Sequence, residues 1–200
     1  MTAIQPTYLF VDTEWADAAG HELVSIALVS VDDQHVFYAE RDPLPSAPTD
    51  FVRRTVYPLL DRGEAAMSDA AMTQALRRFL ASIVHPYVLA DHPRDVQHLR
   101  HVLVGARLSD PQAAPCGSIP SVVTTVMDRQ GTTTAILERW FAQHPQTAAR
   151  RHHALVDARA LRIAWLVATG RISPDWVNSN PDAILPVNGE YAADGQRTER

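Results

Sequence analysis

The sequence predicts an α/β domain in which one sheet is flanked by helices, and three observations favour that class. Three segments rich in β-branched and aromatic residues open the chain, separated by short turns, as is typical of an antiparallel meander. A fourth apolar segment lies farther along, between two stretches whose apolar residues recur at helical spacing. Two more helical segments follow. A chain of 200 residues with 46% hydrophobic content can bury a substantial core, and its length favours a single domain.

The expected elements follow in chain order. The predicted strands are residues 7–11, 22–31, 35–39 and 84–90. The first strand is a candidate for the centre of the sheet because both of its faces are apolar. The predicted helices are residues 51–56, a longer segment capped by Ser68, a segment opened by His92 and Pro93, residues 133–141, and residues 153–169 closed by Gly170. Residues 109–121 hold three prolines and a glycine, and we expect a long loop there.

The periodic pattern fades after Pro174. We therefore expect one domain over residues 1–175 and a C-terminal extension over residues 176–200 that is partly flexible. The single cysteine, Cys116, excludes an internal disulfide. The chain shows no run of eighteen apolar residues and no charged-then-apolar leader, so we expect no membrane span and a cytoplasmic location.

The balance of charge limits the kind of nucleic-acid binding that the chain can perform. Eighteen basic residues, all of them arginine, stand against 23 acidic residues, which gives a formal net charge of −5. That balance argues against a protein that coats long stretches of nucleic acid by displacing counterions. A small site for one end of a nucleic acid remains compatible with it.

Two carboxylates end the first predicted strand, in the segment YLFVDTEW. Side chains alternate along a strand, so Asp12 and Glu14 project on one face and Thr13 on the other. A divalent cation between the two acids would relieve their repulsion, and hard oxygen ligands suit Mg²⁺ or Mn²⁺. The alternative is that the strand stops at Val11 and that the acids belong to a solvated turn.

The fourth predicted strand also runs from apolar to acidic residues, in the segment VLADHPRD. Asp95 lies about one turn into the helix that follows, beside its apolar stripe, where it can face the sheet. The alternative is that Asp91 is an N-cap and Asp95 is a first-turn acid favoured by the helix dipole.

The last predicted helix opens with RHHALVDARAL. Asp157 falls at helical spacing with apolar residues that should pack on the sheet. A buried acid needs a partner, and a cation shared with Asp12 would provide one. For His152 and His153 the alternative is a solvated helix start.

Taken together, the three segments give D-x-E on a first strand, an Asp on the helix after a later strand, and H-x-x-x-x-D at a late helix. This set resembles the DEDD superfamily of 3′-to-5′ exonucleases in its DEDDh, or DnaQ-like, branch, over residues 8–166. The segments VDTEW, ELVSIALVSVD and VFYAE are most similar to small bacterial exoribonucleases related to a mycobacterial adenylate-preferring enzyme. The resemblance implies a ribonuclease-H-like fold with a mixed sheet flanked by helices.

The resemblance also assigns roles to residues of this chain. It implies two Mg²⁺ or Mn²⁺ ions per active site, roughly 4 Å apart. Asp12 would bridge both ions, and Glu14, Asp95 and Asp157 would complete their coordination. His152, five residues before Asp157, matches the catalytic histidine that takes a proton from the attacking water, whereas His153 is one residue too late.

The second motif departs from the pattern of the family. Many relatives read H-N-x-x-F-D, so Asp95 takes the acidic position, Asp91 stands where Asn is usual, and Arg94 replaces an aromatic residue. Asp91 is therefore the fallback ligand, and Asp91 and Arg94 are both candidates for substrate contact.

The expected substrate is the 3′ end of a single-stranded nucleic acid, with RNA implied by the resemblance and DNA left open. Trp15 could stack on the terminal base, or it could be a core residue. Backbone from Thr13 to Trp15 is expected to hold the terminal hydroxyl. Five arginines flank the site in sequence and are candidates for phosphate contacts, namely Arg94, Arg100, Arg107, Arg150 and Arg151. Relatives often form dimers, which leaves a homodimer open.

Three other hypotheses compete with this one. His92, Asp95, His98 and His101 recur every three residues and could supply part of a zinc site, although such steps drift around a helix. A serine or cysteine hydrolase would need a nucleophile near Cys116 or Ser118, where no nucleophile-elbow pattern occurs. A noncatalytic nucleic-acid-binding module on the same fold would be expected to lack one of the carboxylates or the histidine.

Overall fold

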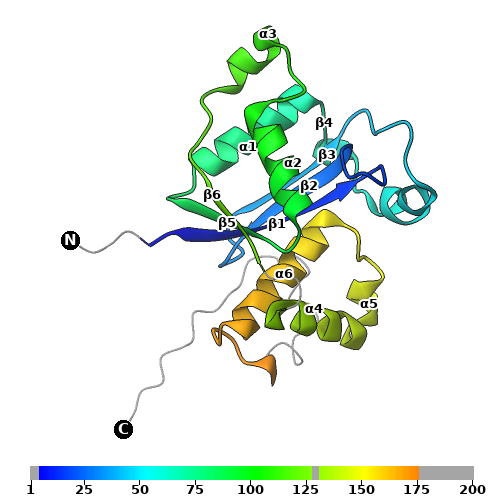
Figure 1. Cartoon of the computed structure of the whole chain (residues 1–200), viewed down its shortest axis with the longest axis vertical. Helices are drawn as coiled ribbons and strands as arrows, with labels where there is room; N and C mark the ends of the chain where they lie inside the picture. The colour runs from blue at the N-terminus through cyan, green and yellow to red at the C-terminus, as the bar shows by residue number, and fades with distance from the viewer. Residues whose placement is uncertain (1–4, 128–130, 176–200) are drawn as a thin grey trace.

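A six-stranded mixed sheet forms the centre of the computed structural model, which describes residues 5–127 and 131–175 (Figure 1). Its strands are β1 (Thr7–Trp15), β2 (Leu23–Ser30), β3 (Val36–Arg41), β4 (Ala66–Met67), β5 (Pro86–Ala90) and β6 (Val123–Val126), in the order β4-β3-β2-β1-β5-β6. β1, β2 and β3 are antiparallel neighbours, and β5 runs parallel to β1. The predicted strands, their meander and the interior position of β1 are confirmed. The expected extension over residues 176–200 lies outside the described residues.

Helices lie on both faces of the sheet. They are α1 (Asp69–Ala81), α2 (Pro93–Val104), α3 (Asp110–Ala113), α4 (Thr132–Gln143), α5 (Pro145–Ala148) and α6 (Ala154–Ala168), with short turns η1 (Val52–Val56), η2 (Tyr57–Leu59), η3 (Gly63–Ala65) and η4 (Ala114–Cys116). Ser68 caps α1 as predicted, since its hydroxyl accepts a bond from the backbone of Ala71. None of the helices within the described residues is both long and apolar enough to cross a membrane.

Three expectations about the elements were wrong. β1 continues to Trp15 instead of ending at Val11, because β2 pairs with it along this length. Residues 109–121 are not a simple loop, since they contain α3 and η4. β6 was not predicted, although its β-branched composition was a usable signal; β4 has two residues and therefore no period to detect.

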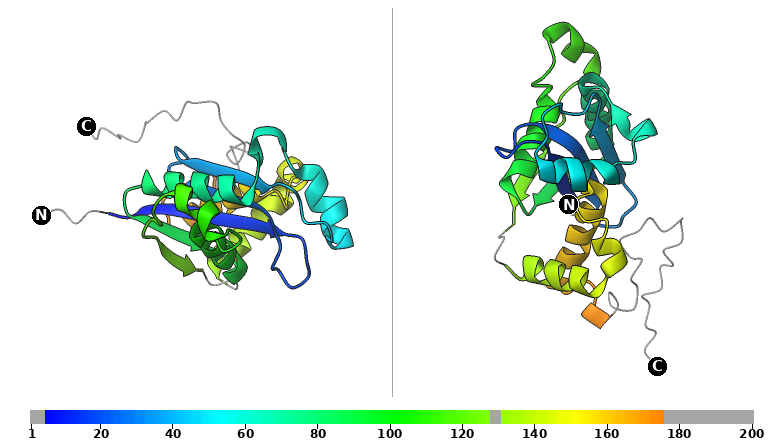
Figure 2. Two further views of the ribbon diagram at one scale, coloured as in Figure 1. Left: turned by 90° about the horizontal axis from the view of Figure 1, so that it is seen from above. Right: turned by 90° about the vertical axis from the view of Figure 1, so that its right-hand side faces the viewer.

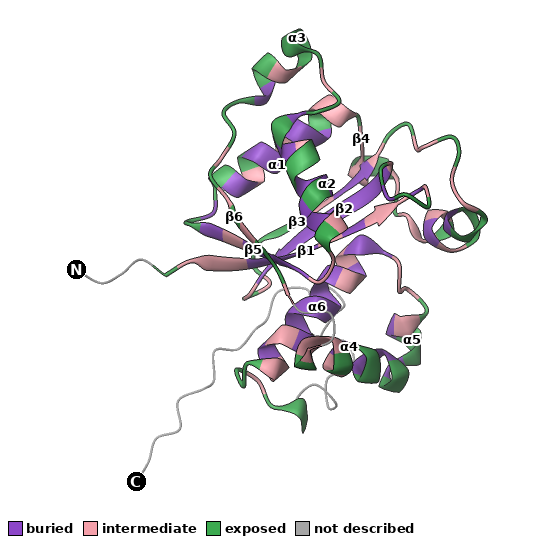
Figure 3. Ribbon diagram, viewed as in Figure 1, coloured by how far each residue is buried: buried purple, intermediate pink, exposed green. Residues whose placement is uncertain are grey.

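The alternation of side chains along β1 divides the core into two layers. Leu9 and Val11 pack with the apolar residues of α1 and α2, whereas Phe10 packs with Leu161 of α6. Figures 1 and 2 show these helices on opposite faces of the sheet, and Figure 3 shows that the central strands are largely buried. The helix α4 packs against α6. The same alternation continues to the end of β1, so Asp12 and Glu14 project from the same face of the strand as Phe10.

Candidate metal centre

The pairing of β1 with β5 brings two acids to the same level of the sheet. Phe10 of β1 is paired with Leu89 of β5 in a parallel ladder. Two residues farther along each segment lie Asp12 and Asp91. β5 ends at Ala90, so Asp91 lies just beyond a strand end. Asp12 remains within β1, which β2 supports. The solvated-turn alternative for Asp12 is therefore wrong.

Asp12, Asp91 and Asp95 form the first ligating group. Each offers a carboxylate oxygen, and these oxygens all lie within 4.8 Å of one another. Asp95 is only 2% exposed, and its Oδ1 accepts bonds from the Thr13 backbone N–H at 3.2 Å and from the Thr13 hydroxyl at 2.7 Å. The prediction that Asp95 faces the sheet is confirmed. His92, not Asp91, is the N-cap of α2, so that alternative for Asp91 is wrong.

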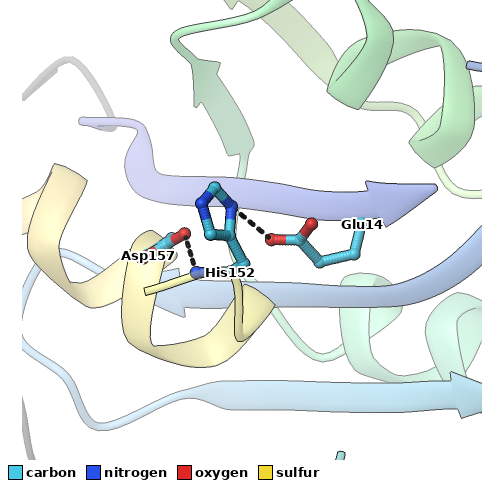
Figure 4. A group of neighbouring side chains, drawn as sticks. All are labelled: Glu14, His152 and Asp157. Atoms are coloured by element: carbon cyan, nitrogen blue, oxygen red, sulfur yellow. Dashed lines mark hydrogen bonds and ion pairs between the residues drawn. The ribbon is translucent and has the colours of Figure 1, made fainter. Parts of the chain in front are cut away.

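Glu14, His152 and Asp157 form the second ligating group, whose ligand atoms also lie within 4.8 Å of one another. His152 stands in the turn before α6 with a positive φ of 73°, and its backbone N–H donates to Asp157 Oδ2 at 2.9 Å. The imidazole Nδ1 lies 4.0 Å from Glu14 Oε1 (Figure 4). The neighbouring His153 is buried against Tyr38, so a solvated helix start is wrong for His153.

The two groups strongly perturb each other's titration. Burial, and then repulsion by Asp95 and Asp157, raises the pKa of Asp12 well above its usual value. Burial and the charge of Asp157 raise the pKa of Glu14 to about 8. Burial also raises the pKa of Asp95 and that of Asp157 to about 7 each. The cluster therefore retains protons near neutral pH, and a bound cation would displace them.

Two buried oxygens support the fit of a divalent cation. Asp12 Oδ2 and Asp157 Oδ1 are buried and have no hydrogen-bond donor among the described residues. Such atoms are costly to bury unless something positive satisfies them. Five carboxylates supply most of the donor atoms, and such oxygen ligands suit Mg²⁺ or Mn²⁺ better than a thiolate-binding metal.

A cleft of about 390 Å³ contains both groups. That volume lies in the range of roughly 300–1,000 Å³ that is usual for small-molecule sites. Its other walls are formed by side chains from several elements, including Trp15, Asp17, Thr49, Phe51, Val52, Leu137, Phe141, Arg151 and Leu161. Phe51 is 52% exposed and meets the ring of His152 edge to face, with centroids 5.0 Å apart. Sequence reasoning missed Phe51, because an apolar residue in a predicted helix carries no signal of exposure.

Of the predicted substrate-binding residues Trp15 and Arg94, one lines the cleft and the other does not. Trp15 lines the cleft, and its ring stacks on His98 and packs against His92, with centroids 6.0 Å and 5.3 Å away. Arg94 is not among the residues that line the cleft. Its guanidinium donates to Gln97 Oε1 at 2.8 Å.

The competing chemistries gain no support from this arrangement. Among residues 5–127 and 131–175, no ligating group includes His98 or His101, two of the four residues considered for a zinc site. Cys116 is buried, and its thiol donates to the carbonyl of Gln112 at 3.3 Å, away from the residues that line the cleft. Neither alternative has a site that its chemistry needs.

Removing the Thr13 hydroxyl is expected to weaken metal binding. In Thr13→Val the side chain keeps its shape, but Asp95 loses its shorter hydrogen bond. Groups that orient a metal ligand commonly contribute 10- to 100-fold, so we expect Mn²⁺ affinity to fall about ten-fold by calorimetry. Thr13→Ser, which keeps the hydroxyl, is the matched control. Equal affinities for Thr13→Val and Thr13→Ser would contradict this role.

Comparisons with known proteins do not assign the chain to a family. No protein-family model matches the chain, and no curated protein is significantly similar to it.

Proposed function

We propose that the chain is a divalent-metal-dependent 3′-5′ exonuclease that removes nucleoside 5′-monophosphates from single-stranded nucleic acid. The observation that carries this proposal is the presence of two adjoining ligating groups in one cleft, Asp12 with Asp91 and Asp95, and Glu14 with His152 and Asp157. RNA is the proposed substrate on the resemblance of the segments around β1, β2 and β3. DNA is the alternative.

The arrangement of the sheet supports a ribonuclease-H-like fold. Three antiparallel strands are followed by β5 and β6, which run parallel to β1, and helices cover both faces. The acids stand at the carboxyl end of the interior strand β1. Ligand sites in α/β sheets commonly lie at the carboxyl ends of strands, so the location agrees with a binding function.

Asp12 is the proposed shared ligand, because it belongs to the first group and lies two residues from Glu14 of the second group on the same strand. Its pKa is raised by burial and then by the charges of all four other carboxylates, Asp95, Asp157, Glu14 and Asp91. It is therefore the acid that can serve both groups. Two Mg²⁺ or Mn²⁺ ions bound there would stabilise charge on the attacking and leaving oxygens and lower the pKa of water. Glu14 and Asp157 would hold one side of the centre, and Asp95 and Asp91 the other.

His152 is proposed to act as the general base. Burial, followed by the charge of Arg151, lowers the pKa of His152, so the ring is neutral at pH 7 and can accept a proton. The oxygen of the attacking water would bond to phosphorus while its proton passes to His152. The bond from phosphorus to the 3′ oxygen of the preceding nucleotide would break, and that oxygen would take a proton from solvent.

Contacts to the terminal nucleotide are proposed for the rim of the cleft. Trp15 presents an aromatic ring there, and aromatic stacking binds bases of any sequence. The backbone around Thr13 lies next to the ligating groups, where the terminal 3′ hydroxyl must be held. Asp91 is proposed as a metal ligand, since its carboxylate oxygen lies within 4.8 Å of those of Asp12 and Asp95.

Digestion of 5′-labelled single-stranded RNA and matched DNA tests this proposal. With Mg²⁺ or Mn²⁺ we expect a ladder that shortens from the 3′ end, and His152→Ala should slow it by at least about 100-fold, as loss of a general base does. His21→Ala is the matched control, because that ring is mostly exposed and pairs with Asp17 outside the ligating groups. Intact binding without cleavage of either substrate would instead indicate the noncatalytic module.

A further inference from the structure

Arg151 is the single arginine among the described residues that line the cleft. Six carboxylate side chains line the same cleft, Asp12, Glu14, Asp17, Asp91, Asp95 and Asp157. The other arginines that flank the site in sequence do not line it. Arg100 donates to the hydroxyl of Thr124, and Arg150 lies 3.5 Å from Asp61. Among residues 5–127 and 131–175, a negatively charged substrate therefore meets a single arginine in a cleft lined by carboxyl groups.

Arg151 is already held by a partner. Its guanidinium donates two hydrogen bonds to the two carboxylate oxygens of Glu138 on α4, one of them at 3.0 Å, and lies over the ring of Phe141 at 4.8 Å. The pair is not buried, since the side chains are 36% and 52% exposed. The hydrogen bond from Arg151 lowers the pKa of Glu138, so Glu138 is charged at neutral pH.

We propose that Arg151 binds a phosphate of the substrate strand and that Glu138 competes with this phosphate for the guanidinium. This inference rests on the proposed exonuclease function. Arginine presents a planar fork that matches carboxylate and phosphate alike, so Glu138 uses the same two N–H groups that a phosphate would use. Because Arg151 keeps its charge at all relevant pH values, the competition is decided by position and charge and not by proton transfer. Glu138 therefore weakens substrate binding.

The competition predicts opposite effects of two charge-neutralising substitutions. Glu138→Gln should lower KM for 5′-labelled single-stranded RNA about two- to five-fold, as release of a surface ion pair permits. At pH 8, where His152 is neutral with or without the charge of Arg151, Arg151→Gln should raise KM about ten-fold with kcat changed by less than about two-fold, because a contact made in both ground and transition state affects binding alone. In the double variant, Glu138→Gln should have no further effect. Arg139→Gln is the matched control for Arg151→Gln, because it removes one positive charge from an exposed position on α4.

The dependence on salt separates a phosphate contact from a structural brace between α4 and the turn before α6. Loss of one phosphate contact on a single strand should make the plot of log kcat/KM against log salt shallower by about 0.7. A brace would instead lower Tm in both single variants and leave that slope unchanged. The inference is overturned if Glu138→Gln leaves KM unchanged or raises it, or if it lowers KM equally when Arg151 is replaced.

Failure of this inference can be told apart from failure of the proposed function. Fluorescence anisotropy with the same RNA and Ca²⁺ measures binding without turnover. If the wild type does not cleave but Glu138→Gln tightens binding only when Arg151 is present, the exonuclease proposal fails and the competition stands. If the wild type cleaves and Glu138→Gln does not tighten binding, the competition alone is overturned.

Discussion

Replacing Asp12 with Asn is expected to lower kcat/KM for single-stranded RNA by at least about 1,000-fold, because the residue proposed as the shared ligand of both metal ions loses its charge. The same substitution should raise the Tm of the metal-free protein at pH 8. Burial and the charges of the neighbouring carboxylates disfavour the charged form of Asp12, and the amide removes that cost. A loss of activity that accompanies a gain in stability distinguishes a functional defect from unfolding.

The control for this substitution is Asp17→Asn. Asp17 also lines the cleft, but it stands outside both ligating groups, and its Oδ1 accepts bonds from the backbone of His21 and Glu22 that an amide oxygen can also accept. We expect Asp17→Asn to change kcat/KM by less than about ten-fold. Comparable activity in Asp12→Asn and wild type would show that the cleft is not the catalytic site.

The Tm of the metal-free protein is expected to fall as pH rises from 6.5 to 8.5, and excess Mg²⁺ should abolish most of that fall. Burial raises the pKa of Glu14 to about 8 and that of Asp157 to about 7, above the value near 4 in the unfolded chain. The folded state therefore binds more protons, so the stabilisation present at low pH is lost as pH rises through the folded pKa values. The loss over this window is on the order of 2 kcal/mol, or roughly 4–8 °C.

Histidines with a lowered pKa make stability rise with pH at lower pH values, which is opposite to the effect of the carboxylates. The pH range of the measurement therefore decides which effect is seen. Burial lowers the pKa of His98 to about 4, and also lowers the pKa of His152 and that of His153. Their contribution to stability rises with pH through about 6.5 and levels off near pH 7.5, where the histidines are neutral in both states. Between pH 6.5 and about 7.5 the histidines offset part of the fall, and above about pH 7.5 the carboxylates alone set the slope.

Mg²⁺ should raise Tm most at the alkaline end of the window. A ligand at 100 times its dissociation constant stabilises by about 2.7 kcal/mol, which is roughly 5–10 °C for a chain of this size. Differential scanning fluorimetry at several pH values, with and without the metal, measures the effect. A Tm that rises with pH above 6.5 in the metal-free protein, or that Mg²⁺ leaves unchanged, would contradict the assigned cluster.

The elements with a clear period were predicted from the sequence, and so was the short helix η1, whereas β4 and α3 were not. The apolar run of β1 and the capped amphipathic helices α1 and α2 carry patterns that follow from side-chain geometry alone. β4 and α3 have two and four residues, so tertiary pairing and packing decide them. The end of β1 was misplaced for a related reason. Polar residues past Val11 look like a turn unless the pairing with β2 is known.

The candidate site was predicted in its acids but not in its walls. Asp12, Glu14 and Asp157 stood out because each is a carboxylate in an apolar pattern, and the structure brings them into one cleft. Asp91 and Asp95 could not be separated from the sequence, and both prove to lie in the first ligating group. Phe51 comes from a distant segment, so only the folded chain shows that it meets His152.

Binding of Mn²⁺ measured by isothermal titration calorimetry tests the central claim most directly, since it asks whether the two ligating groups form a metal centre. We expect two ions per wild-type chain, fewer in Asp12→Asn, and an unchanged number in Asp17→Asn. Proton release on binding should be detectable as a dependence of the heat on the buffer, because the carboxyls retain protons near neutral pH. Absence of binding at millimolar Mn²⁺, or a stoichiometry that Asp12→Asn leaves unchanged, would contradict it.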